Sequence, residues 1–155
     1  MLLDHVQVAM PAGREAAARA FYGTALGLRE IPKPAPLAAR GGVWYAVGDQ
    51  ELHLGVAEDF SPAKKAHPAF RVPDAVAVAE RLREASFAAR WDTSLPGCTR
   101  FFTDDPFGNR IEIIGVAPRG NERHEEERDP LTGVPLIRSA RPITEDDVRS
   151  LEDHG

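Results

Sequence analysis

Apolar residues in the first half of the chain recur with the periods expected for strands and for one helix. Residues 14–26 carry apolar side chains at helical spacing, and Gly27 is placed to end that helix. Apolar runs predict strands at 4–10, 28–31, 42–47 and 51–57, with a hairpin turn about Gly48. Between them, the Pro-rich stretch 32–36 is predicted as an irregular connection. The first half therefore has the predicted order βαβββ.

The second half repeats this order. We predict a strand at 67–72, a helix at 74–85, and strands at 88–91, 100–103 and 110–116. The closing strands of both halves have a similar apolar pattern and end in Gly-Val-Ala. The pattern predicts an α+β fold made of two βαβββ modules, residues 1–57 and 67–116, with 58–66 as the linker. The aromatic residues predicted to lie in the core are Phe21, Tyr22, Trp44 and Phe70.

Four residues of metal-binding type occupy related places in the two halves. His5 and His67 open them, and His53 and Glu112 lie in their closing strands. Because successive side chains of a strand point to opposite faces, all four are predicted to lie opposite the apolar stripe of their strands. If helices cover the apolar faces, the four side chains can share one cavity. The residues predicted to line the same wall are Gln7, Glu51, Arg71 and Arg110.

Composition excludes several classes of protein. The net charge of −5 argues against a nucleic-acid partner, since phosphate binding needs clustered Lys and Arg. No apolar run approaches the roughly 20 residues that span a bilayer, and no secretory signal is recognised, so no membrane role and a cytoplasmic location are expected. The single Cys98 is predicted to be a structurally minor thiol.

Four short motifs, in order, give the chain a family resemblance: Leu3-Asp-His-Val, Phe21-Tyr-Gly-Thr-Ala-Leu-Gly-Leu, His67-Pro-Ala-Phe-Arg-Val and Asp105-Pro-Phe-Gly-Asn-Arg-Ile-Glu-Ile. Over residues 2 to 116 the sequence resembles the vicinal oxygen chelate superfamily, which includes glyoxalases, extradiol dioxygenases and bleomycin resistance proteins. The resemblance implies two βαβββ modules that form a cupped, partly open β-barrel around a divalent metal ion, with helices outside. Its ligands would come from the first, fourth, fifth and eighth strands, which here carry His5, His53, His67 and Glu112.

Imidazole and carboxylate donors suit Zn, Fe, Ni, Co or Mn, and such a site leaves open positions for a substrate with neighbouring oxygens. His5, His67 and Glu112 are the firmer predicted ligands, with Glu112 also counted as catalytic. His53 is predicted either as a fourth ligand or as a catalytic base beside the metal; the spacing leaves both roles open.

Phe101 and Phe102 stand where extradiol dioxygenases usually carry a tyrosine, so we expect lyase or isomerase chemistry on a small oxygen-rich substrate ahead of oxygenation. The alternative is a different class: a metal-free protein that sequesters a ligand or antibiotic, as the bleomycin resistance proteins do. A homodimer is expected. Residues 117–155 form a charged C-terminal tail in which 131–137 could pack as an arm and Thr144 could cap a short helix.

Overall fold

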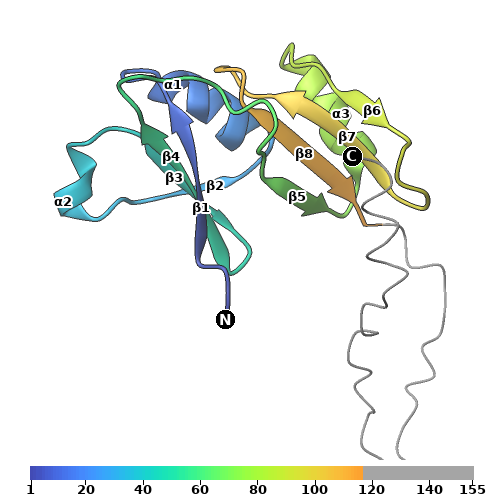
Figure 1. Cartoon of the computed structure of the whole chain (residues 1–155), viewed down its shortest axis with the longest axis horizontal. Helices are drawn as coiled ribbons and strands as arrows, with labels where there is room; N and C mark the ends of the chain where they lie inside the picture. Colours follow the sequence, from blue (N-terminus) through green and yellow to red (C-terminus); the bar gives the residue numbers. More distant parts are fainter. Residues whose placement is uncertain (117–155) are drawn as a thin grey trace, which may run out of the picture. The chain divides into compact units, whose positions relative to one another are not determined.

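The first module is a four-stranded sheet of order β1-β4-β3-β2 in the computed structural model, which describes residues 1–116 (Figure 1). Its elements are β1 (His5–Met10), α1 (Glu15–Ala18), a π-helical segment η1 (Arg19–Ala25), β2 (Arg29–Ile31), α2 (Ala35–Ala38), β3 (Val43–Val47) and β4 (Gln50–Val56). Strand β1 runs parallel to β4, with Gln7 opposite His53, while β3 pairs antiparallel with both β2 and β4. This parallel pair brings the first and last strands of the module together.

The second module repeats this topology with the order β5-β8-β7-β6 (Figure 1). Its elements are β5 (Ala69–Val72), α3 (Ala75–Glu84), β6 (Arg90–Asp92), β7 (Thr99–Asp104) and β8 (Arg110–Gly115). Strand β5 runs parallel to β8, with Ala69 opposite Glu112. The predicted pair of βαβββ modules in an α+β fold is therefore confirmed.

The start of β5 and the connection between β2 and β3 differ from the prediction. Strand β5 begins at Ala69, so His67 lies just before the strand, although the Pro68 carbonyl still accepts a hydrogen bond from the Glu112 backbone. The short helix α2 lies in the connection that was predicted to be irregular. Pro36 occupies one of its first positions, where a missing N–H costs nothing.

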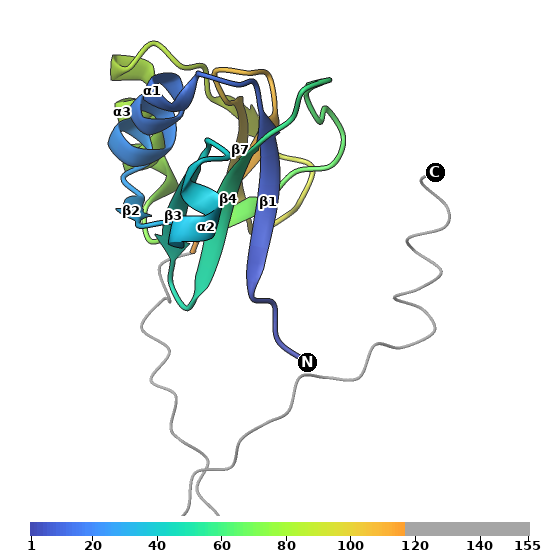
Figure 2. The same ribbon diagram turned by 90° about the vertical axis from the view of Figure 1, so that its left-hand side faces the viewer.

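Apolar faces of both sheets pack with the helices into one core. The buried strand residues are Val8, Met10, Val43, Tyr45, Leu52, Leu54, Phe101, Ile111 and Ile113, and they share this core with Phe21 and Tyr22 of η1 and Val78 and Leu82 of α3. Figure 2 shows α1 and α3 on the same side of strands β1, β3 and β4. Strand parity thus predicted correctly the buried apolar face of β1, β4 and β8, and in β5 the apolar residues Phe70 and Val72 are partly buried against the same core.

Asp105 and Asn109, at the two ends of the β7–β8 turn, join the modules. Asp105 accepts hydrogen bonds from the Tyr22 hydroxyl (2.8 Å) and from the Asn109 side chain (2.8 Å). Asn109 also donates to the carbonyl of Ala9 (2.9 Å) and accepts from the backbone N–H of Ala63 (3.1 Å). Burial, and next the Asp105 carboxylate, raise the pKa of Tyr22 well above its usual value. This buried network holds β1, η1, the linker and the β7–β8 turn together.

No helix among residues 1–116 is long and apolar enough to cross a membrane. The predictions made for the C-terminal tail, including the arm at 131–137 and the cap at Thr144, lie outside the described residues.

Candidate functional site

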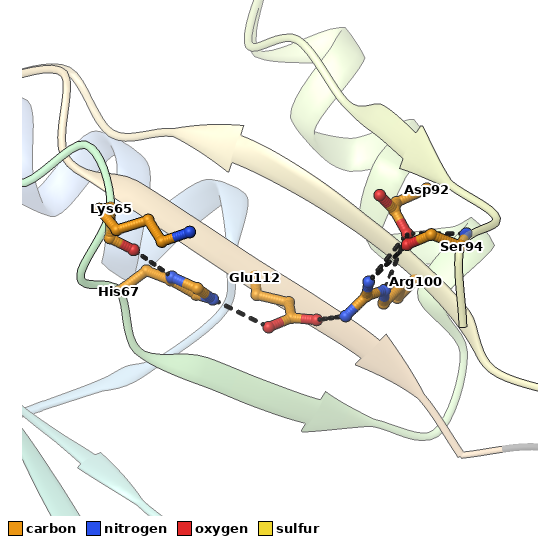
Figure 3. Close-up of polar contacts among 6 residues, drawn as sticks. All are labelled: Lys65, His67, Asp92, Ser94, Arg100 and Glu112. Atoms are coloured by element: carbon orange, nitrogen blue, oxygen red, sulfur yellow. Dashed lines mark hydrogen bonds and ion pairs between the residues drawn. The ribbon is translucent and has the colours of Figure 1, made fainter. Parts of the chain in front are cut away.

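His67 and Glu112 meet on the second module (Figure 3). Nε2 of His67 lies 3.0 Å from Oε2 of Glu112, and Nδ1 of His67 lies 2.8 Å from the backbone carbonyl of Lys65. Glu112 is buried, with its side chain 8% exposed, and His67 is partly buried. The pairing of β5 with β8 therefore brings the His67 ring nitrogen and the Glu112 carboxylate, which are far apart in the sequence, into direct contact.

The hydrogen bonds of His67 require a proton or a cation at its contact with Glu112. The Lys65 carbonyl can only accept, so Nδ1 of His67 carries a proton. In the neutral imidazole Nε2 then has a lone pair, yet it faces a Glu112 oxygen that is also an acceptor when ionised. Either a further proton or a cation must lie between Nε2 and Oε2. The 3.0 Å spacing is that of an ordinary hydrogen bond, and it also brings the two atoms close enough to bind one metal ion at about 2.0–2.2 Å from each.

Arg100 holds the other oxygen of Glu112. Its Nη1 donates to Oε1 at 2.8 Å, while Nε and Nη2 donate to Oδ1 of Asp92 at 3.1 and 2.9 Å (Figure 3). Asp92 also accepts a hydrogen bond from the hydroxyl of Ser94, which with Arg100 lowers the pKa of Asp92 below its usual value. Since Arg100 occupies Oε1, only Oε2 of Glu112 is left to face His67.

The first module holds the other two candidate ligands in a stack of rings. The ring of His53 lies parallel to that of Trp44, with centroids 3.7 Å apart, and to that of His5 at 4.3 Å. Nε2 of His53 lies 2.7 Å from Oε2 of Glu51, and Nδ1 of His5 lies 2.7 Å from the exposed Asp4 carboxylate. His53 is buried, whereas His5 is exposed at the start of β1.

The three histidines differ in which ring nitrogen is engaged. In His5 and His67, Nδ1 contacts an oxygen, which leaves Nε2 as the nitrogen that would bind a metal ion; in His67 this Nε2 faces Glu112. This arrangement is common in metal-binding histidines. In His53 it is Nε2 that donates to a carboxylate, so that Nδ1 carries the lone pair. His53 therefore resembles a histidine oriented by a carboxylate for proton transfer.

The four candidate ligands are brought together as two pairs, His5 with His53 and His67 with Glu112. In the part of the chain that the structure describes, no three His, Cys, Asp or Glu side chains are close enough to hold a metal ion. The four-residue ligand set thus stays a prediction.

The four predicted wall residues are distributed over both modules. Gln7 lies opposite His53 and packs its amide against Gly55, where a Cβ would lie within 2.8 Å of it. Glu51 is engaged with His53, and Arg71 is exposed on β5. The guanidinium of Arg110 lies 3.8 Å from the ring centroid of Phe102. Gln7 and Arg110 line one cavity of about 390 Å³ together with His67.

Sequence reasoning missed three residues around the candidate ligands. Trp44 was predicted to be core, but it is only partly buried and stacks on His53. Phe102 lies opposite Glu112 on the neighbouring strand, just as Trp44 lies opposite His53. Arg100, which holds Glu112, was not predicted to belong to the site. The internal repeat carried the missed signal, since equivalent positions beside the two closing strands both hold aromatic rings.

The family model of the Glyoxalase/Bleomycin resistance protein/Dioxygenase superfamily matches residues 2–113 of this chain. The chain belongs to this superfamily. A glyoxalase family protein from Bacillus anthracis is similar in structure, with 47% identity and a TM-score of 0.73 over 76% of this chain and 96% of that one. No curated protein matches the sequence significantly.

More distant solved structures share the fold. A lactoylglutathione lyase from Agrobacterium tumefaciens is 17% identical, with a TM-score of 0.58 over 74% of this chain and 92% of that one. A fosfomycin resistance protein from Listeria monocytogenes is 11% identical, with a TM-score of 0.60 over 76% and 95%. The resemblance seen in the sequence motifs is confirmed at the level of superfamily and fold.

Proposed function

We propose that this protein is a metal-dependent enzyme of the glyoxalase type, a lyase or isomerase that acts on a small substrate with neighbouring oxygens. The observation that carries the proposal is the contact between Nε2 of His67 and Oε2 of Glu112, which needs a cation or an additional proton between two acceptors. The engaged nitrogens of His5 and His67 support the same role. Superfamily membership and the lactoylglutathione lyase among the similar structures agree with it.

His67, Glu112 and His5 would hold the metal. A divalent ion bound there supplies Lewis-acid polarisation of the substrate oxygens. Arg100 keeps the Glu112 carboxylate in one orientation, and the Lys65 carbonyl does the same for the His67 ring. Zn, Fe, Ni, Co and Mn all accept two imidazoles and one carboxylate.

His53 would move a proton of the substrate. Its Nδ1 is the basic atom when Nε2 donates to Glu51, and the stack between Trp44 and His5 fixes the plane of the ring. A lyase or isomerase of this type needs a base beside the polarised carbonyl, because the proton on the neighbouring carbon must be removed. Glu51 is then a positioning residue rather than a substrate ligand.

A second copy of the chain would complete each metal site. The two donor pairs lie on separate sheets, and no described cluster in a single chain reaches three donors. Strand β1 is one of the two edge strands of its sheet, and an edge strand presents backbone groups that can pair with another chain. His5 of one copy would therefore join His67 and Glu112 of the other, in a homodimer.

Elemental analysis of the purified protein, followed by titration with Zn, Ni, Mn and Fe(II), tests the proposal. We expect the wild-type protein to bind about one ion per chain. Glu112→Ala and His67→Ala should weaken metal affinity by more than about 100-fold, which exceeds the 10–100-fold loss typical when a hydrogen-bond partner of a ligand is changed. Glu84→Ala, a change of an exposed glutamate on α3, is the matched control and should bind normally. His53→Ala should keep most of the affinity. A wild-type protein that binds none of these ions would refute metal-dependent catalysis and favour the ligand-sequestering class.

Mixing variants tests the site between copies. His5→Ala and Glu112→Ala chains, each defective alone, are unfolded together and refolded. If the site is shared, half of the sites in a mixed dimer contain both substitutions and half contain neither, so tight metal binding returns. If binding does not return although mixed dimers are present, the ligands come from one chain.

A further inference from the structure

The connection between β2 and β3, residues 32–42, is longer than the fold requires. The equivalent connection of the second module, between β6 and β7, spans only residues 93–98. The helix α2 within the longer connection buries none of its residues. A segment that adds nothing to the core and yet has a defined structure is where binding residues are often placed.

Two hydrogen bonds fix the end of this connection. The Lys33 ammonium donates to the carbonyl of Gly41, and the Glu15 carboxylate accepts from the backbone N–H of Gly42 at 2.9 Å. A Cβ on Gly42 would lie 2.1 Å from the carbonyl oxygen of Leu54, so only glycine lets the backbone approach β4 this closely. The connection is thus held against the strand that carries His53.

A cavity of about 230 Å³ lies between this connection and the sheet. Lys33 and Arg40 line it from the connection, and Trp44 and Gln7 line it from β3 and β1. Trp44 is the residue that stacks on His53, and Gln7 is the cross-strand neighbour of His53, so the cavity lies beside the proposed proton-transfer residue. Its volume is below the roughly 300–1,000 Å³ typical of sites for drug-sized ligands.

The charge of this cavity is not neutralised within the described chain. The guanidinium of Arg40 forms no hydrogen bond or ion pair with any residue of 1–116. Lys33 uses one of its three N–H groups on Gly41. Glu15 is the acidic group near Lys33, and its carboxylate is engaged by Gly42, the main reason its pKa is lowered. The Arg40 side chain is exposed and Lys33 is partly buried, so the Arg40 guanidinium and part of the Lys33 ammonium are accessible to an anion that enters from solvent.

We propose that this cavity is an oxyanion subsite, in which Arg40 and Lys33 bind a carboxylate or phosphate group of the substrate and Trp44 contacts its apolar body. This inference rests on the proposed function and specifies its substrate class: a small acid whose reactive oxygens lie on the metal side of His53 and whose anionic end points to α2. The Arg40 guanidinium can bind an oxyanion through two parallel N–H groups. The ring of Trp44 gives the same cavity a flat apolar surface, so a short or flat acid fits it.

Fluorescence titration of the full-length metal-loaded protein tests the subsite. Trp91→Phe leaves Trp44 as the remaining tryptophan, so its emission reports on this cavity. The probes are benzoate for the carboxylate arm, phenyl phosphate for the phosphate arm and benzamide as the neutral control of similar shape. We expect binding of at least one anion, weakening with salt, and at least tenfold weaker binding of benzamide.

In the same background, Arg40→Gln should weaken anion binding about tenfold or more, and Arg40→Lys should restore part of it. Arg83→Gln, an equal change of charge on the exposed side of α3, should change nothing. Equal affinity for benzoate, phenyl phosphate and benzamide, or no effect of Arg40→Gln relative to Arg83→Gln, would overturn the subsite. Anion binding that depends on Arg40 in a protein that takes up no metal would uphold the subsite while the proposed enzyme function fails.

Discussion

Replacing Arg100 by Gln removes the charge that holds Glu112 without changing any of the three proposed metal ligands, His5, His67 and Glu112. Arg100 lies 2.8 Å from Oε1 of Glu112, and the pair is largely buried, with the side chains 20% and 8% exposed. A hydrogen bond to a charged group contributes about 1.5–3 kcal/mol. Outer partners of metal ligands typically contribute 10–100-fold in metal affinity, equivalent to about 1.4–2.7 kcal/mol. The two ranges agree, so Arg100→Gln should raise the dissociation constant for zinc by about 10–100-fold.

The measurement is a competition titration of zinc against a chelator, with circular dichroism to establish that the variant is folded. Arg90→Gln is the matched control, because Arg90 also holds a carboxylate through two hydrogen bonds, at 2.8 and 3.0 Å to Asp104. That pair is about half exposed and does not touch Glu112, so the zinc affinity of this control should stay within twofold of wild type. If Arg100→Gln binds zinc as tightly as Arg90→Gln, the interpretation of Arg100 as a positioning residue is wrong.

Three further changes test the fold around the site, each followed by urea denaturation. Asn109→Ala should lower the free energy of unfolding by about 3–5 kcal/mol, since this buried side chain loses three hydrogen bonds; a loss no larger than in exposed Gln50→Ala would contradict this. Burial raises the pKa of Tyr45 to about 12, so its neutral form is favoured in the folded state and stability should fall as pH rises above about 10. Tyr45→Phe should reduce that fall and cost little at pH 7, because the buried hydroxyl has no partner within the described residues; an unchanged alkaline profile would count against the burial argument. Gly42→Ala, with φ at +82° and a clash with Leu54, should destabilise by more than Gly48→Ala, where φ is +60° and a Cβ meets nothing within 4 Å.

The alternation of apolar and polar residues was enough to predict the modules and the orientation of their strands. Val8 and Met10 of β1, and Leu52 and Leu54 of β4, are buried in the core, so the opposite parity of His5 and His53 follows. These are local properties, because the period of a strand or helix is set by backbone geometry within a few residues. The helix at 74–85 was predictable for the same reason, and the structure shows Asp74 accepting from the N–H groups of Val76 and Ala77 as its cap.

The sequence alone thus determined two βαβββ modules and the place of His5, His53 and Glu112 opposite the apolar faces of their strands, while the tertiary structure decided which metal-type residues meet, His67 included. In the tertiary structure His67 contacts Glu112, and His53 stacks on His5. Arg100 donates to Oε1 of Glu112, and Trp44 stacks on His53 instead of lying in the core. The tertiary structure also showed that Lys33 and Arg40, from the connection between β2 and β3, line one cavity. The physical reason is that these contacts join strands that are distant in the sequence, so their partners depend on strand register and packing rather than on the local pattern.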